Sequence, residues 1–150
     1  MATLTFEDLG DDHFTVQGTA NVYEVTTPRN PATIIRLDQA WRVEFDWRSE
    51  GPDNHVIGGD WQLKIYLERM GGLEFSFTPP TGEATEPLRP ALNYSQYTEY
   101  IEIPANTVNE AGLYKLVASI THTGLDASGN PSRVAGFAEG PLLQFYEVKP

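Results

Sequence analysis

Five candidate metal ligands fall in two segments of the sequence that show no strand pattern. Their imidazole nitrogens and carboxylate oxygens are the donors that zinc and similar ions accept. The spacing matches no known ligand motif, and residues 126–130 lack the alternating acidic ligands and the final glutamate of a calcium loop. We therefore predict a β-turn at 126–130 and expect no bound metal or cofactor. The five residues are Asp53, His55, Asp60, His122 and Asp126.

Residues suited to catalysis are sparse. The chain has no Cys, and it contains no G-x-S-x-G sequence that would place a serine on a nucleophile elbow. Glu99 and Glu102 fall on opposite faces of one expected strand, so they cannot flank a glycosidic bond together. Phosphate-loop and dinucleotide fingerprints are also missing from the sequence. We expect a protein that is not an enzyme, and the one catalytic hypothesis left is a metal-dependent hydrolase that uses His55 and His122.

Three tyrosines suggest a different chemistry. Tyr94, Tyr97 and Tyr100 cluster where a long loop is expected to lead into a strand. Flat aromatic rings stack on sugar rings while neighbouring Asp, Asn and Arg side chains bond the hydroxyls. This pattern is typical of a carbohydrate-binding module. The structural alternative is that Tyr100 packs against its sheet neighbours and Tyr94 pins the loop.

The net charge and the hydropathy of the chain limit the classes of partner that it can bind. The net charge of −11 repels nucleic acid and anionic lipid at long range. No apolar stretch approaches the ~20 residues that span a bilayer, and the first residues lack the basic and then apolar stretch of a secretory signal. We expect neither nucleic-acid binding nor membrane insertion. Localisation is unknown and cytoplasmic only by default, since a chain without Cys folds equally well in either redox compartment.

Alternation of apolar and polar residues predicts an all-β chain. Within residues 41–48, Trp41, Val43, Phe45 and Trp47 share one face while charged residues occupy the other, which is the pattern of a half-buried antiparallel strand. The 13 Gly and 11 Pro residues interrupt the chain too often for long helices. We expect strands at residues 14–25, 33–37, 41–48, 61–68, 73–77, 97–103, 113–121 and 134–148, a surface loop at 78–95, and an edge position or bulge at Gly140-Pro141.

The segment 110–116 resembles a tyrosine corner, which is typical of the immunoglobulin-like β-sandwich superfamily. The residues that carry the resemblance are Gly112 and Tyr114. It implies an antiparallel sandwich of about seven or eight strands, with no significant helix, that fills residues 1–150 as one domain, and a Tyr114 hydroxyl near residues 107–110. Leu116 stands where antibody domains carry a disulfide Cys, and either Trp47 or Trp61 is the core tryptophan. A lipocalin-like or jelly-roll barrel would give similar alternation and is the alternative fold.

The strand order of such a sandwich places three long connections at one end: residues 49–60, 78–95 and 122–132. Binding residues concentrate in loops whose ends a rigid sheet holds. We therefore predict a non-catalytic binding or interaction module that contacts a protein partner or associates with itself, with carbohydrate binding as the alternative. The ligand-binding candidates at this end are Asp53, His55, Tyr94, Tyr97, His122 and Asp126.

Overall fold

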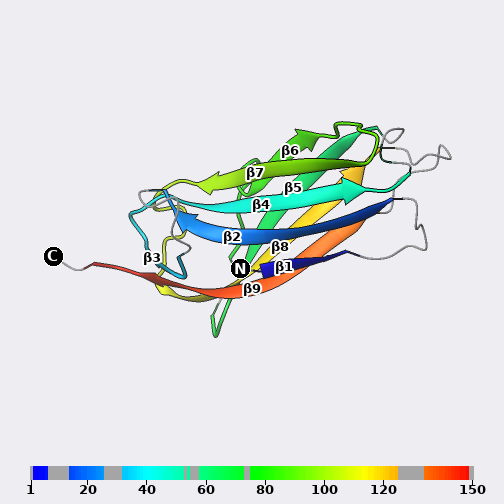
Figure 1. Ribbon diagram of the computed structural model, residues 1–150. Helices are drawn as coiled ribbons and strands as arrows, with labels where there is room; N and C mark the ends of the chain where they lie inside the picture. Colours follow the sequence, from blue (N-terminus) through cyan, green and yellow to red (C-terminus); the bar gives the residue numbers. More distant parts are fainter. Residues whose placement is uncertain are drawn as a thin grey trace.

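Two mainly antiparallel sheets pack face to face in the computed structural model of this chain (Figure 1). The structure describes residues 2–6, 14–25, 32–52, 54, 58–72, 75–124 and 134–148, and these ranges contain nine strands and no helix. No helix in the described ranges is therefore long and apolar enough to cross a membrane. The predicted all-β sandwich class is confirmed, with nine strands in place of the expected seven or eight.

Sheet A follows the order β1-β2-β4-β7, and all of its pairs are antiparallel. The central pair joins β2 and β4 over ten residues, from Thr15 opposite Glu50 to Glu24 opposite Trp41. The same ten residues of β4 also pair with β7. The strands are β1 (Ala2–Phe6), β2 (Thr15–Glu24), β4 (Trp41–Glu50) and β7 (Tyr94–Ile103).

Sheet B follows the order β6-β5-β8-β9, and β3 pairs with β9 in parallel. The strands are β3 (Ile34–Arg36), β5 (Asp60–Arg69), β6 (Glu83–Pro87), β8 (Gly112–Thr123) and β9 (Ala135–Tyr146). The register of β8 against β9 shifts between Lys115 and Val117, opposite the Gly140-Pro141 step. The bulge expected there is confirmed. On its other side β9 pairs with β1 at Gly136 and Phe137 and with β3 from Gln144 to Tyr146, and no pairing of the described residues on that side includes Gly140-Pro141, so an edge position of this step is also compatible with the structure.

Two strands depart from the expected layout. The strand predicted at residues 73–77 is replaced, within its described part, by a single bridge between Leu67 and Phe75. The place beside β5 belongs instead to β6, which lies inside the segment expected to be a loop. Pro79 and Pro80 lack the amide donors that a ladder requires, so pairing resumes only after them. The second departure is β1, which pairs with β2 at its start and with β9 at its end and thereby joins the two sheets.

The core lies between the two layers and contains all three tryptophans, each at most 1% exposed. Trp47 of sheet A meets Trp61 of sheet B edge to face, with ring centroids 6.1 Å apart. Trp47 and Trp61 are therefore both core tryptophans, although only one of them was expected to be. Leu116, which stands in the position of a disulfide Cys, is also buried. The Tyr114 hydroxyl donates a 2.8 Å hydrogen bond to the Glu110 carbonyl, so the predicted tyrosine corner is confirmed.

Candidate functional site

The described parts of the three long connections meet at one end of the sandwich, as expected from the strand order. The Gly51 amide donates to the Asn93 carbonyl at 3.3 Å, and the Leu88 amide donates to the Gly59 carbonyl at 3.0 Å. His122 lies at the end of β8, where the third connection begins, and its ring Nε2 lies 2.7 Å from the Gly58 carbonyl oxygen.

Asn54 ties two of these connections together from a fully buried position. Its Oδ1 accepts a 2.6 Å hydrogen bond from the Ser49 hydroxyl, and its Nδ2 donates to the Ala91 carbonyl at 2.8 Å and to the Ser95 hydroxyl at 3.1 Å. The amide oxygen and the amide nitrogen of Asn54 therefore both form hydrogen bonds inside the protein. The end of the sandwich is therefore held by a buried polar cluster whose residues are not free to bind a ligand.

His122, one of the predicted ligand-binding residues, is also buried. Its ring packs against Trp61, with centroids 5.2 Å apart, and against Phe14 at 6.4 Å. Burial lowers the pKa of His122, while the bond to the Gly58 carbonyl and the charge of Asp60 raise it by less. The neutral ring therefore acts as a packed donor and does not present a nitrogen to solvent.

The other predicted residues of the loop end have different outcomes. Asp53, His55 and Asp126 lie outside the described residues, so their predicted roles stay predictions. The hydrolase hypothesis requires an accessible ring nitrogen on His122, but this residue is only 4% exposed. Among the described residues, no group of three or more His, Cys, Asp or Glu side chains is close enough to hold a metal ion.

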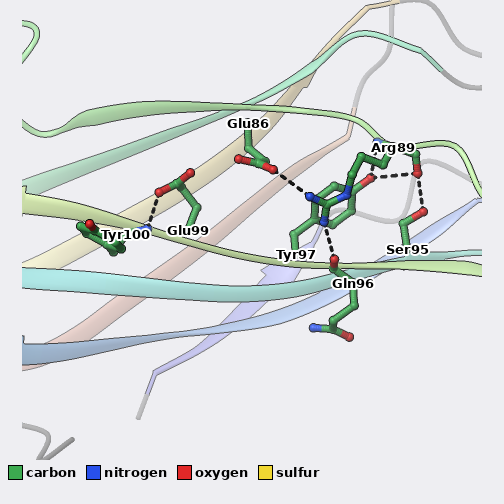
Figure 2. Close-up of polar contacts among 7 residues, drawn as sticks. All are labelled: Glu86, Arg89, Ser95, Gln96, Tyr97, Glu99 and Tyr100. Carbon is green, nitrogen blue, oxygen red and sulfur yellow. Dashed lines mark hydrogen bonds and ion pairs between the residues drawn. The ribbon is translucent and has the colours of Figure 1, made fainter. Parts of the chain in front are cut away.

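Tyr97 does not belong to a solvent-facing site, which corrects the expectation from the sequence. Its ring stacks on Trp47 in the core with centroids 5.0 Å apart and planes 9° apart. Its hydroxyl accepts a 2.9 Å hydrogen bond from the Arg89 amide. Figure 2 shows the Arg89 guanidinium lying against the same ring, with Cζ 4.6 Å from the centroid. Every surface of Tyr97 is in use, so it cannot stack on a sugar.

Arg89 also closes the open side of the sandwich, where the edge strands β6 and β7 lie near each other. It bridges Glu86 of β6 at 3.1 Å and the Gln96 carbonyl of β7 at 2.6 Å (Figure 2). Burial raises the pKa of Glu86, and so do its hydrogen bond to Glu99 and the charge of that residue, while Arg89 lowers it. The neighbouring Glu99 thus favours the protonated form of Glu86 at the seam between the sheets.

The outer face of sheet A, which we call the polar face, carries the remaining predicted residue, Tyr94. It is 50% exposed, and the Arg48 guanidinium lies over its ring with Cζ 3.9 Å from the centroid. Tyr100 repeats the arrangement six positions further along β7, with Arg42 Cζ 5.0 Å from its centroid. The structural alternative for Tyr100, packing against its sheet neighbours, fits this contact.

Residues that lie opposite one another on neighbouring strands form rows across the polar face. A shallow depression of about 410 Å³ lies on this face between the row that contains Tyr94 and the row that contains Tyr100. Sequence reasoning did not identify its residues as a site, although alternation had placed Arg48 and Asp46 on the outside of β4. The missing information was the register, which sets Gln17 opposite Arg48 on one side and Gln96 opposite it on the other. Its outward polar side chains are Thr3, Gln17, Thr19, Asp46, Arg48 and Gln96.

The outer face of sheet B, which we call the apolar face, carries exposed apolar side chains among the ion pairs of Lys64 and Lys115. Along β9, Phe137 and Leu142 are each about half exposed, and Leu113 of β8 and Tyr66 of β5 are exposed on the same side. The adjacent Leu142 and Leu143 were the available sequence signal, since only one of two neighbouring residues in a strand faces the core. The apolar side chains of this face are Ile34, Tyr66, Leu113, Val117, Phe137 and Leu142.

No protein-family profile matches the chain, and no curated protein sequence matches it. Its fold is similar to a crystal structure of the CARDB domain of the PF1109 protein from Pyrococcus furiosus in complex with di-metal ions, at 13% identity over 93% of this chain and 99% of that chain, with a TM-score of 0.42. It is also similar to a Niemann-Pick type C2 protein from the Japanese carpenter ant, at 10% identity over 95% and 99% of the two chains, with a TM-score of 0.45. Likenesses of this size assign no ligand or partner to this chain.

Proposed function

We propose that this chain is a non-catalytic interaction module that associates with a second copy of itself through the apolar face. The observation that carries the proposal is the gathering of six apolar side chains on the outside of one sheet. Contiguous exposed apolar surface on a folded domain marks an interaction site. A two-fold dimer would bury the same surface of both copies at once.

The size of the apolar face suits a stable dimer. Three strands of the sheet, β5, β8 and β9, contain 10 to 12 residues, while β6 and β3 contain 5 and 3. At ~3.3 Å per residue and ~4.8 Å between strands, the five strands together cover roughly 650 Å², which approaches the ~800 Å² that each partner contributes to a standard interface. Two such sheets pack face to face in the manner of a sandwich core.

Local charge also favours a second copy. Lys115 is ion-paired with Glu68 at 3.1 Å and with Glu139 at 3.5 Å, and Lys64 is paired with Glu83 at 3.7 Å. Two lysines and three glutamates leave a net charge of −1 among these groups, out of −11 for the chain. Most of the repulsion between two copies therefore arises away from the contact, where salt screens it.

Sedimentation velocity over a concentration series tests the proposal. We expect the mass to rise from 16.7 kDa toward twice that value, and association to strengthen between 0.1 and 0.5 M NaCl as like charges are screened. Leu142→Asp should weaken dimerisation by about tenfold or more, because the new carboxylate is buried once in each copy. Leu142 is 48% exposed, so the variant should remain folded.

The matched control is Leu92→Asp, which adds the same charge at a leucine that is 77% exposed and lies in the connection between β6 and β7. This variant should dimerise like the parent. A chain that stays monomeric at every concentration and salt would overturn the proposal, and so would a dimer that Leu142→Asp leaves intact. Association that requires a basic protein and weakens with salt would assign the apolar face to a different partner.

A further inference from the structure

We infer that the polar face binds an uncharged oligosaccharide in the depression beside Tyr94. The site lies on the opposite side of the sandwich from the apolar face, so the inference does not rest on self-association. Three features carry it. They are a hollow lined by side chains that form hydrogen bonds, a half-exposed tyrosine at its margin, and a local charge that suits a neutral ligand.

The lining offers donors and acceptors side by side, as sugar hydroxyls require. Gln17, Arg48 and Gln96 form one row across β2, β4 and β7. Thr19 and Asp46 form the next row, which Thr3 of β1 extends. Because a hydroxyl both donates and accepts, a surface that alternates amide, guanidinium, carboxylate and hydroxyl groups matches a polyol better than it matches an apolar ligand.

Two of these side chains are held in place before any ligand arrives. Gln96 Nε2 donates a 3.1 Å hydrogen bond to the Trp47 carbonyl, which leaves the amide oxygen of Gln96 to accept. Asp46 Oδ1 accepts a 2.6 Å bond from the Thr98 hydroxyl, which leaves Oδ2 available. Fixed side chains lose little conformational freedom when they bind, so they contribute more affinity per contact.

Tyr94 provides the apolar part of the recognition. Its row, which also contains Glu50, adjoins the row of Arg48. The Arg48 guanidinium supports the ring from one side, 3.9 Å from its centroid, while half of the side chain stays exposed. A planar ring held in this way can stack on the C–H face of a sugar whose hydroxyls reach the neighbouring row.

The arrangement repeats at Tyr100, which fits a chain of sugars better than a single one. Six positions of β7 separate the two tyrosines, a distance of about 20 Å along an extended strand. The depression occupies the two rows between them. A ligand several residues long would contact both rings and the polar lining together.

Local charge argues for a neutral ligand. Two arginines and four acidic residues point outward from β4 and β7, giving this part of the face a net charge of −2 within a chain of −11. An anionic polymer would be repelled by this surface. The six residues are Arg42, Glu44, Asp46, Arg48, Glu50 and Glu102.

Native affinity electrophoresis tests the inference with named soluble polymers: a mixed-linkage β-glucan, a glucomannan, a xylan, a galactan and the anionic polygalacturonate. We expect at least one neutral polymer to retard the protein, and Tyr94→Ala and Gln17→Ala each to weaken that retardation by about tenfold or more. Met70→Ala is the matched control, because Met70 is 51% exposed, as Tyr94 is 50% exposed, but lies just beyond the end of β5 and belongs to neither proposed surface. It should be retarded like the parent.

Several results would overturn the inference. They are no retardation by any neutral polymer, retardation by polygalacturonate alone, and retardation that Tyr94→Ala leaves unchanged while the melting temperature of the variant matches that of the parent. The two proposals fail separately. Tyr94→Ala should leave dimerisation intact, and Leu142→Asp should leave retardation by the polymer intact.

Discussion

Gly18 of β2 lies directly opposite Trp47 of β4, and the two strands leave no room for a side chain at position 18. A Cβ atom at Gly18 would lie 2.7 Å from Trp47 Cβ and 2.6 Å from the Asp46 carbonyl oxygen. This close approach helps to set the position of the Trp47 indole, which stacks on Tyr97 and meets Trp61 edge to face. The packing of the central aromatic cluster thus depends on a residue that contributes no side chain to it.

Gly18→Ala should therefore destabilise the fold by about 1–3 kcal/mol, because the added methyl forces the backbone of β4 and the Trp47 side chain to move. Urea unfolding followed by tryptophan fluorescence measures the effect. Gly58→Ala is the control, since a Cβ there would meet nothing within 4 Å. Equal unfolding midpoints for the two variants would show that β2 and β4 can separate without loss of stability.

Tyr114→Phe tests the tyrosine corner without emptying the core. The ring would keep its edge-to-face contact with Phe145, whose centroid is 5.4 Å away, and lose only the 2.8 Å hydrogen bond to the Glu110 carbonyl. We expect a loss of about 0.5–1.5 kcal/mol, which corresponds to a melting temperature lower by roughly 2–5 °C for a domain of this size. Tyr66→Phe, at an exposed position of β5, should melt with the parent. An unchanged melting temperature in Tyr114→Phe would mean that the hydroxyl adds nothing to the corner.

The sequence predicts best those strands that have one buried face and one solvent-exposed face. In β4 every second residue from Trp41 to Trp47 is at most 1% exposed, because the strand has a hydrogen-bonded neighbour on each side and the opposite sheet beneath it. The tyrosine corner is predictable for another reason. Its hydrogen bond joins Tyr114 to a residue four positions away, so a short segment contains the whole motif.

Edge strands and long-range pairing are harder to predict. None of the residues of β6 is buried, so the strand carries no apolar alternation to read. The role of β1 in joining the two sheets depends on Ala20 and Phe137, residues far away in the sequence. The burial of Tyr97, in contrast, was predictable. Tyr97 lies on the same face of its strand as Ile101 and Ile103, whose apolar side chains face the core. This alternation is a stronger signal than the position of Tyr97 near a loop.

The stability of the fold should depend on pH through His122. Burial lowers the pKa of His122 from its ordinary value of 6.5, and its Nδ1 has no hydrogen-bond partner among the described residues. The folded protein therefore binds this proton less readily than the unfolded chain does. The stability that the neutral ring contributes is fully present above pH 6.5 and is lost as pH falls through the unfolded and then the folded pKa.

His122→Gln removes the titration while leaving an amide that can donate to the Gly58 carbonyl. Urea unfolding at pH 8, 7, 6 and 5 should show the parent more stable than the variant at pH 8. The gap should narrow as pH falls below about 6.5, by at most ~1.4 kcal/mol per pH unit. Carboxylates titrate in both proteins, so their effects cancel in the difference. A gap that stays constant from pH 8 to pH 5 would mean that the protonated ring is tolerated between Trp61 and Phe14, and that His122 contributes only its shape to the core.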